Sequence, residues 1–331
     1  MKARLFVTMA AATLLLAGCS SDENEGTDNW NGEIRLSSGV TMQARANTQA
    51  EQILSGETVY AWVDKATSPT AMEYIKAWTL TASGNGSFTG STQYYPTDGS
   101  NLNFYAFHGN FASGSFTEGT TGFPGSAIVH TVASDQSGTD MKEYAKSDLL
   151  YAASKGVARS SSAVQLTFYH LLSKIEVALK AGDGNPDLTG ATVTIEGTKL
   201  KADFSPAKSA TSSADYANFV SLTSSGNNQN EVTAIKIGSA TSTDFNSDPT
   251  YNEAIIVPQT LVQSTPFIKV TLADGATLVY NLDEKTEFAS GKKYIYQITA
   301  KKSGLAVTSK IADWEAVGDT PKTGDAVMPV N

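Results

Sequence analysis

The sequence has 331 residues, of which 17% are charged, with a net charge of −9 and a single cysteine. This charge balance argues against nucleic acid as a partner, because phosphate contacts need clustered Lys and Arg. One cysteine excludes a disulfide framework, and a chain of this length can bury its cores without one. The low charge and the abundance of Gly, Ser and Thr are typical of a secreted β-protein.

The N-terminus has the features of a targeting segment. Lys2 and Arg4 precede the apolar run Leu5–Leu16. A membrane span needs roughly 20 apolar residues, so this shorter run indicates a secretory signal peptide over residues 1–18. No later apolar run is long enough to cross a membrane.

Cys19 follows this signal at the end of the stretch LAGC. Taken alone, it could be a free thiol in a secreted protein. The stretch resembles the bacterial lipobox, which implies that Cys19 carries lipid and anchors the chain to the outer membrane through more than one acyl chain. The polar segment Ser20–Glu25 cannot form a core, and it resembles the export signal of Bacteroidetes surface lipoproteins. That resemblance implies a location on the cell surface.

Alternation of apolar and polar residues predicts half-buried strands over Asn101–His108, Ala163–His170 and Lys174–Lys180. The stretch Val270–Leu282 predicts two strands that turn at Asp274-Gly275, a two-residue hairpin signal. Further short strands are predicted at Thr58–Val63, Trp78–Ala82, Leu149–Ala153, Thr192–Ile195, Glu231–Ile237, Ala254–Val257 and Tyr294–Ala300.

Such short strands, separated by turn residues, predict an all-β protein built from sandwiches rather than βαβ units. Only Asn47–Leu54 and Asp140–Ala145 suggest short helices. The Ser- and Gly-rich stretch Ser154–Ser162 is the predicted linker, which divides the chain into domains at 46–160 and 161–331.

The sequence offers little chemistry. Its three histidines, His108, His130 and His170, have no base or metal ligand at motif spacing. We therefore expect structural histidines, no catalytic residue, no metal and no cofactor. The acidic pair Asp283-Glu284 is expected to be solvated, although an all-β glycosidase with two distant carboxylates stays open.

The aromatic residues allow two interpretations. The groups Tyr94-Tyr95, Phe104-Tyr105 and Tyr294–Tyr296 are expected in the core or in cross-strand pairs. The alternative is a sugar-stacking surface.

Several blocks, in order along the chain, resemble the fimbrillins of Bacteroidetes, which are pilin-like lipoproteins. The matching blocks are QYYPTDGSNLNFYAFHG (93–109), SDLLYA (147–152), LTFYHLLSKIEVAL (166–179), AIIVPQ (254–259) and GKKYIYQITAKKSGLAVTSKIADW (291–314). The resemblance implies two transthyretin-like Greek-key β-sandwich domains in tandem. It also implies a structural or adhesive subunit of a surface fimbria, with no enzymatic activity.

The resemblance further implies that, in this family, a protease removes the lipidated N-terminal segment together with its first strand. A strand of another fimbrial subunit then fills the groove that is left, by strand addition. The removable strand in this chain is expected over Glu33–Ala44. The cut is expected between Arg45 and Ala46, because Arg35 would lie inside the strand. The alternative is that Arg45 is an ordinary solvated arginine.

The donor strand of the family comes from the C-terminal tail, here Glu315–Asn331. Pro321 and Pro329 interrupt this tail and remove hydrogen-bond donors. A stalk role is therefore in doubt, and an accessory, tip or anchor role stays open.

Two other functions compete with the fimbrial one. A surface lipoprotein that binds glycans and never polymerises is the first alternative, and an all-β hydrolase is the second. A host or bacterial surface glycan or protein is a further partner under the adhesive interpretation.

Overall fold

A computed structural model describes residues 30–40, 52–66, 72–223, 231–246 and 249–314. The signal peptide, Cys19, the Arg45-Ala46 junction and the tail after Trp314 lie outside these residues, so the expectations placed on them stay predictions. Within the described ranges, no helix is long and apolar enough to span a membrane.

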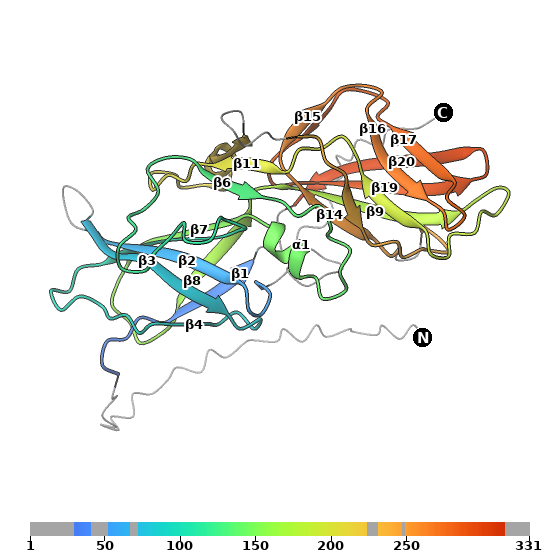
Figure 1. Ribbon diagram of the computed structural model, residues 1–331. Helices are drawn as coiled ribbons and strands as arrows, with labels where there is room; N and C mark the ends of the chain where they lie inside the picture. The colour runs from blue at the N-terminus through green and yellow to red at the C-terminus, as the bar shows by residue number, and fades with distance from the viewer. Residues whose placement is uncertain (1–29, 41–51, 67–71, 224–230, 247–248, 315–331) are drawn as a thin grey trace, which may run out of the picture. The chain divides into compact units, whose positions relative to one another are not determined.

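The first half of the chain forms one large sheet (Figure 1). Its seven strands follow the order β1-β8-β7-β5-β2-β3-β4. The elements of this half are β1 (Leu36–Val40), β2 (Thr58–Lys65), β3 (Met72–Ala82), β4 (Phe88–Gly90), β5 (Leu102–His108), β6 (Ile128–Thr131), α1 (Lys142–Ser147), β7 (Leu150–Val157) and β8 (Val164–His170).

The second half contributes two four-stranded sheets, β13-β10-β16-β17 and β14-β9-β19-β20, and the pair β15-β18. Its elements are β9 (Ser173–Ala181), β10 (Thr192–Ile195), β11 (Lys201–Phe204), α2 (Ser213–Tyr216), a 3-10 turn η1 (Ala217–Phe219), β12 (Val220–Leu222), β13 (Ile235–Ile237), β14 (Asn252–Ile256), β15 (Gln259–Leu261), β16 (Pro266–Thr271), β17 (Thr277–Asn281), β18 (Thr286–Phe288), β19 (Lys292–Lys301) and β20 (Gly304–Asp313). The predicted all-β fold class is confirmed.

The linker prediction for Ser154–Ser162 is wrong. Ser154–Val157 completes β7, and β8 follows as its neighbour in the same sheet, so the sheets divide after His170 rather than at residue 160. The misleading signal is compositional, because a solvent-exposed connection between two strands of one sheet has the same Ser and Gly content as a linker. The halves are also joined by backbone pairing, since β6 pairs with β11 in a small sheet, β12-β11-β6.

The three alternating stretches all form strands, but only β8 is half-buried, with its alternate side chains exposed. In β5 the second face is also buried, because Tyr105 and Phe107 pack beneath other aromatic rings. In β9 the second face holds Lys174 and Glu176, which are buried as ion pairs. The prediction of a half-buried strand is therefore wrong for β5 and β9.

The hairpin around Asp274-Gly275 forms between β16 and β17. The amide of Leu272 donates to the carbonyl of Ala276 at 2.8 Å and closes the hairpin. The loop between these residues therefore has three residues, 273–275, rather than two. Gly275 has φ +86°, the left-handed conformation that such three-residue loops require.

The predicted helix near Asp140 forms as α1, shifted toward the C-terminus. The other predicted helix, Asn47–Leu54, lies mostly outside the described residues. A further helix, α2, was not predicted. Ser212 and Asp215 form a reciprocal capping box at its start, and this S-x-x-D spacing was the available signal.

The aromatic groups proposed as a core are largely buried. Tyr95, Phe104, Tyr105, Tyr294 and Tyr296 each expose 3% or less of their surface. Only Tyr94, with 46% exposure, faces solvent. The core interpretation is therefore confirmed for all of these residues except Tyr94.

Candidate strand-addition site

The strand predicted to be removable, Glu33–Ala44, has its described part at one end of the seven-stranded sheet. Its residues Leu36–Val40 form β1, drawn in blue in Figure 1. Residues 41–44 lie outside the described ranges. β1 is held on both sides, by β8 and by a segment that contains β4.

On one side, β1 pairs in parallel with β8, from Leu36 opposite Val164 to Val40 opposite Phe168. The carbonyl of Arg35 accepts a hydrogen bond from the amide of Val164 at 2.8 Å. These two strands are far apart in the sequence, so their pairing closes a long loop.

On the other side, the chain meets residues 86–95. The amide of Ile34 donates to the carbonyl of Gln93, and the amide of Ser38 donates to the carbonyl of Gly86, both at 2.7 Å. The amide of Tyr95 donates to the carbonyl of Gly32 at 2.8 Å. β1 thereby joins the two ends of the sheet. It occupies both of the edges that would be unpaired if the strand were removed.

The side chains of this segment alternate as a strand should. Ile34, Leu36 and Ser38 point inward with exposures of 3%, 8% and 9%. Arg35 is exposed, and the hydroxyl of Ser37 donates to Oε1 of Gln165 on β8 at 2.9 Å. Burying the two aliphatic side chains stabilises the strand by roughly 1.5–3 kcal/mol each.

Close backbone packing accompanies these bonds. Gly86 has φ +82°, and a Cβ at this position would lie 2.9 Å from the carbonyl oxygen of Ser38. Any larger residue would push the strand away, so a glycine is required on this wall of the site.

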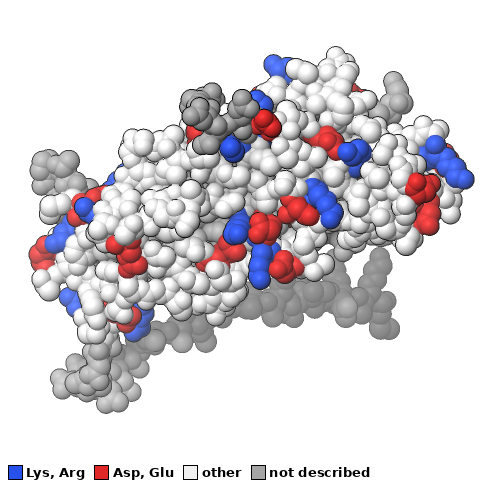
Figure 2. Space-filling model, in the orientation of Figure 1, with Lys and Arg blue, Asp and Glu red and all other residues white. Residues whose placement is uncertain are grey.

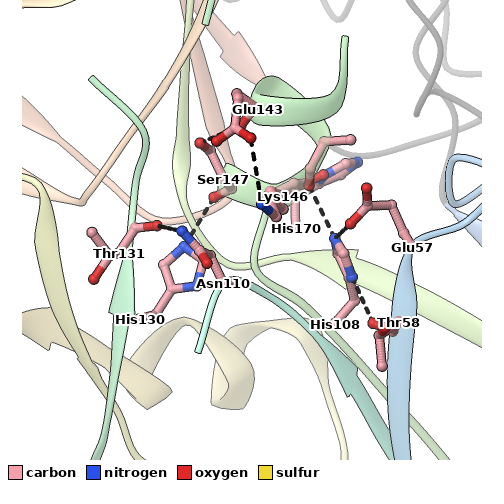
Figure 3. Close-up of polar contacts among 12 residues, drawn as sticks. Glu57, Thr58, His108, Asn110, His130, Thr131, Glu143, Lys146, Ser147 and His170 are labelled. Atoms are coloured by element: carbon pink, nitrogen blue, oxygen red, sulfur yellow. Dashed lines mark hydrogen bonds and ion pairs between the residues drawn. The ribbon is translucent and has the colours of Figure 1, made fainter. Parts of the chain in front are cut away.

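The three histidines lie outside this site, and the rings of His108 and His130 are bonded to backbone (Figure 3). The ring nitrogens of His108 contact the carbonyl oxygens of Thr58 at 2.8 Å and Ala145 at 3.0 Å. His170 pairs with Asp148 at 2.9 Å and stacks on Trp314 with a centroid distance of 4.0 Å. These contacts hold α1 and the residue after it against β5 and β8, as expected for structural histidines.

His130 is fully buried and neutral. Its Nδ1 accepts from the amide of Asn110 at 3.0 Å, so its Nε2 carries the proton that is donated to the carbonyl of Ser147 at 2.9 Å. Burial lowers the pKa of His130 to about 4, and the bond to Ser147 opposes this shift. The imidazole is therefore neutral and is held in place by its two hydrogen bonds to the backbone.

A second buried polar group lies where α1 covers the sheet of β9 and β14. Nζ of Lys174 lies 3.0 Å from Oε1 of Glu176 and 2.9 Å from Oε2 of Glu253, and the hydroxyl of Tyr144 on α1 donates to Glu253 at 2.9 Å. Burial lowers the pKa of Lys174, but the attraction of the two carboxylates outweighs it and leaves the pKa above its ordinary value. This cluster ties elements of both halves together, and Nζ of Lys293 on β19 adds a second cation at 3.7 Å from Oε1 of Glu176.

On the face shown in Figure 2, acidic and basic side chains are interspersed rather than gathered in one large patch. Among the described residues, no group of three His, Cys, Asp or Glu side chains is placed to hold a metal ion. The pair Asp283-Glu284 is exposed, as expected.

Sequence reasoning identified β1 but not all of its partners. The alternation of Ile34 and Leu36 was sufficient to predict a strand. The wall formed by residues 86–95 was not predicted, because its contacts are made by the backbone of Gly86, Gln93 and Tyr95 and leave no side-chain period. Cys19, Arg45 and Ala46 lie outside the described residues, so the predictions made for them stay predictions.

Known proteins resemble this chain in sequence and in fold. A protein of Bacteroides uniformis named as fimbrium subunit Fim1C is 26% identical, with 98% of this chain and 100% of the relative covered. Crystal structures of proteins assigned to cell adhesion share the fold. The one from Bacteroides ovatus has a TM-score of 0.58 at 19% identity and covers 87% of this chain and 99% of its own. The one from Bacteroides uniformis has a TM-score of 0.55 at 20% identity and covers 86% and 99%.

The sequence model of the family described as fimbrillin-like matches residues 44–314, which is most of the chain. The resemblance seen in the sequence blocks is thereby confirmed. The family comprises fimbrial and adhesive subunits rather than enzymes. The chain belongs to the fimbrillin-like family.

Proposed function

We propose that this chain is the precursor of a cell-surface fimbrial subunit that assembles by strand addition in the place of β1. Acylated Cys19 holds the precursor to the outer membrane, and cleavage between Arg45 and Ala46 breaks the covalent link between the mature subunit and its anchor. A strand of another fimbrial subunit then occupies the site between β8 and residues 86–95. The subunit serves in an accessory, tip or anchor position, and an anchor subunit would keep the Arg45 bond intact.

The observation that carries this proposal is the two-sided bonding of β1. Removing the strand would expose the β8 edge on one side and the carbonyls of Gly86 and Gln93 on the other. Unpaired strand edges are templates for another chain, and main-chain bonds would then give the affinity. Membership of the fimbrillin-like family supports the same use of the site.

The position of the two arginines supports a cut at Arg45. The carbonyl of Arg35 is bonded to Val164, between the buried side chains of Ile34 and Leu36. A protease needs a segment that can be extended in its own cleft, so cleavage at Arg35 would first require β1 to leave the sheet. Arg45 lies five residues beyond the end of β1 in the sequence, so a cut there breaks no described bond of the strand.

The test is limited trypsin digestion of the chain from Ser20 onward. We expect a stable product that begins at Ala46 and acquires affinity for a strand peptide or forms oligomers. Arg45→Gln should keep the chain intact under the same conditions, and the matched variant Arg35→Gln should be cut like the original.

Two outcomes would overturn the proposal. One is a stable product that still contains Glu33–Ala44 in a continuous chain. The other is a product that begins at Ala46 but stays monomeric and binds no strand peptide. Either outcome would favour an anchored surface protein that does not assemble.

A further inference from the structure

The site that holds β1 has a defined length and a defined preference for side chains and backbone. Its backbone bonds and strand pairings run from the carbonyl of Gly32 to the pairing of Val40 with Phe168. Nine consecutive residues are therefore bound. This length defines the segment that an incoming strand must supply.

The backbone of the segment alternates strictly between its two neighbours. Gly32, Ile34 and Ser38 turn their peptide groups to residues 86–95, and Arg35 turns its carbonyl to β8. By the alternation of a strand, the amide of Ser37 faces β8 as well. This position is thus that of a central strand, in which a proline removes a bond wherever the replaced amide donates, as those of Ile34 and Ser38 do.

The inward side chains set the second requirement. The inward positions are occupied in order by Gly32, Ile34, Leu36 and Ser38, which are all buried. Small residues stand at the two outer positions, and aliphatic residues stand at the two inner ones. The outward position of Arg35 is exposed, so side chains on that face are weakly selected.

From these features we infer that the site accepts a proline-free strand of nine residues from another protein chain, with small, aliphatic, aliphatic and small residues at positions one, three, five and seven. The strand runs parallel to β8, as β1 does. This inference rests on the proposed function and specifies the partner that it requires.

The chain's own C-terminal tail does not meet these requirements. Its longest proline-free run after Trp314 is Lys322–Met328, which has seven residues. Every nine-residue window of Glu315–Asn331 therefore contains Pro321 or Pro329. In the last window, TGDAVMPVN, the proline takes the position of Ser38, whose amide donates to Gly86. The segment Glu315–Asn331 of another copy is for that reason expected to be a poor donor to this site.

The experiment measures peptide binding to the full chain from Ser20 after it has been cut at residues 45–46, through a site-specific protease sequence placed there. Four labelled nine-residue peptides compete for the site. The first is GEIRLSSGV, which copies Gly32–Val40, and two variants of it carry Ser37→Ala or Ser37→Pro. The fourth is the tail peptide TGDAVMPVN.

The two variants distinguish what the side chain of Ser37 contributes to affinity from what its backbone amide contributes. Ser37→Ala removes only the hydroxyl bond to Gln165, so we expect affinity within about threefold of the parent peptide. Ser37→Pro also removes the amide that faces β8 and places a rigid ring in the ladder, so we expect a loss of at least about tenfold. The tail peptide should bind at least about tenfold more weakly than the parent.

The outcomes distinguish this inference from the proposed function. If the parent peptide binds while the Ser37→Pro and tail peptides bind weakly, the inference is supported. Equal binding of the parent, Ser37→Pro and tail peptides would overturn the inferred selectivity and leave strand addition standing. If no peptide binds, including the copy of β1, the proposed function itself fails.

Discussion

Replacing Lys174 with Met tests how much the buried ion pairs between β9 and β14 stabilise the fold. Lys174 lies between Glu176 on its own strand and Glu253 on β14, at 3.0 and 2.9 Å, and all three side chains are at least 95% buried. Methionine matches the lysine stem in length, so the substitution keeps the packing and removes the charge. It leaves Glu253 without its cation, whereas Glu176 keeps Lys293 on β19, whose Nζ lies 3.7 Å from its Oε1.

The expected loss follows from that geometry. Removing one partner of a buried ion pair destabilises a protein by about 3–5 kcal/mol, because the remaining charge is desolvated without compensation. Glu253 loses its cation while Glu176 keeps Lys293, so we expect a loss within this range at neutral pH. Lys292→Met is the matched control on β19, because its ion pair with Asp313 is exposed and should contribute at most about 1 kcal/mol.

The loss should depend on pH in a defined direction. Burial raises the pKa of Glu253, and Lys174 opposes that shift. Without Lys174 the pKa rises further. A carboxyl whose folded pKa lies above its unfolded pKa contributes stability at low pH and loses it as pH rises. The deficit of Lys174→Met should therefore shrink when the pH is lowered from 8 to 5.

The assay is urea unfolding, followed by tryptophan fluorescence at pH 8, 7 and 5, for the original chain and both variants. A deficit for Lys174→Met no larger than that for Lys292→Met would refute the argument. So would a deficit that grows as the pH falls, because the buried carboxylates would then not be its source.

Two further predictions concern His130 and β1. The pKa of His130 is lowered to about 4, chiefly by burial, against about 6.5 in an unfolded chain. Below pH 6.5 the unfolded state binds the extra proton, so His130 should reduce the unfolding free energy by about 3 kcal/mol between pH 6.5 and 4. NMR titration of its ring protons should show a midpoint near 4. A midpoint near 6.5 would contradict the prediction. Leu36→Ala should destabilise β1 by about 2 kcal/mol, because Leu36 is 8% exposed, whereas Arg35→Ala should change it by less than about 0.5 kcal/mol. Hydrogen exchange of the β1 amides measures both, and equal exchange rates in the two variants would argue against an inward Leu36.

The alternation of apolar and polar residues predicted the positions of the strands better than the burial of their two faces. The residues Leu166 and Phe168 of β8 alternate with exposed neighbours, so the period alone was sufficient. Lys174 and Glu176 count as polar in any such pattern, and they become buried only because Glu253 arrives from a distant strand. Burial that depends on a non-local partner leaves no periodic signal in its own stretch.

Pairing between distant strands limited the prediction of the site in the same way. The strand character of β1 is local and was visible, whereas its parallel pairing with β8 closes a loop of more than a hundred residues. The domain boundary was missed for a related reason. Ser154–Ser162 has the composition of a linker, and only the pairing of β7 with β8 shows that it joins neighbours in one sheet.

The two-sided bonding of β1 has a consequence for assembly under the proposed function. A cut at Arg45 leaves the hydrogen bonds of β1 and the burial of Ile34 and Leu36 intact, because the cut lies beyond the strand. The freed segment would therefore stay in place until another strand displaces it, and the open edges would not be exposed to unspecific pairing in the meantime. Cleavage would then make exchange possible, and the affinity of the incoming strand would drive it. Since both strands compete for the same main-chain bonds, the side chains at the inward positions would decide which one remains.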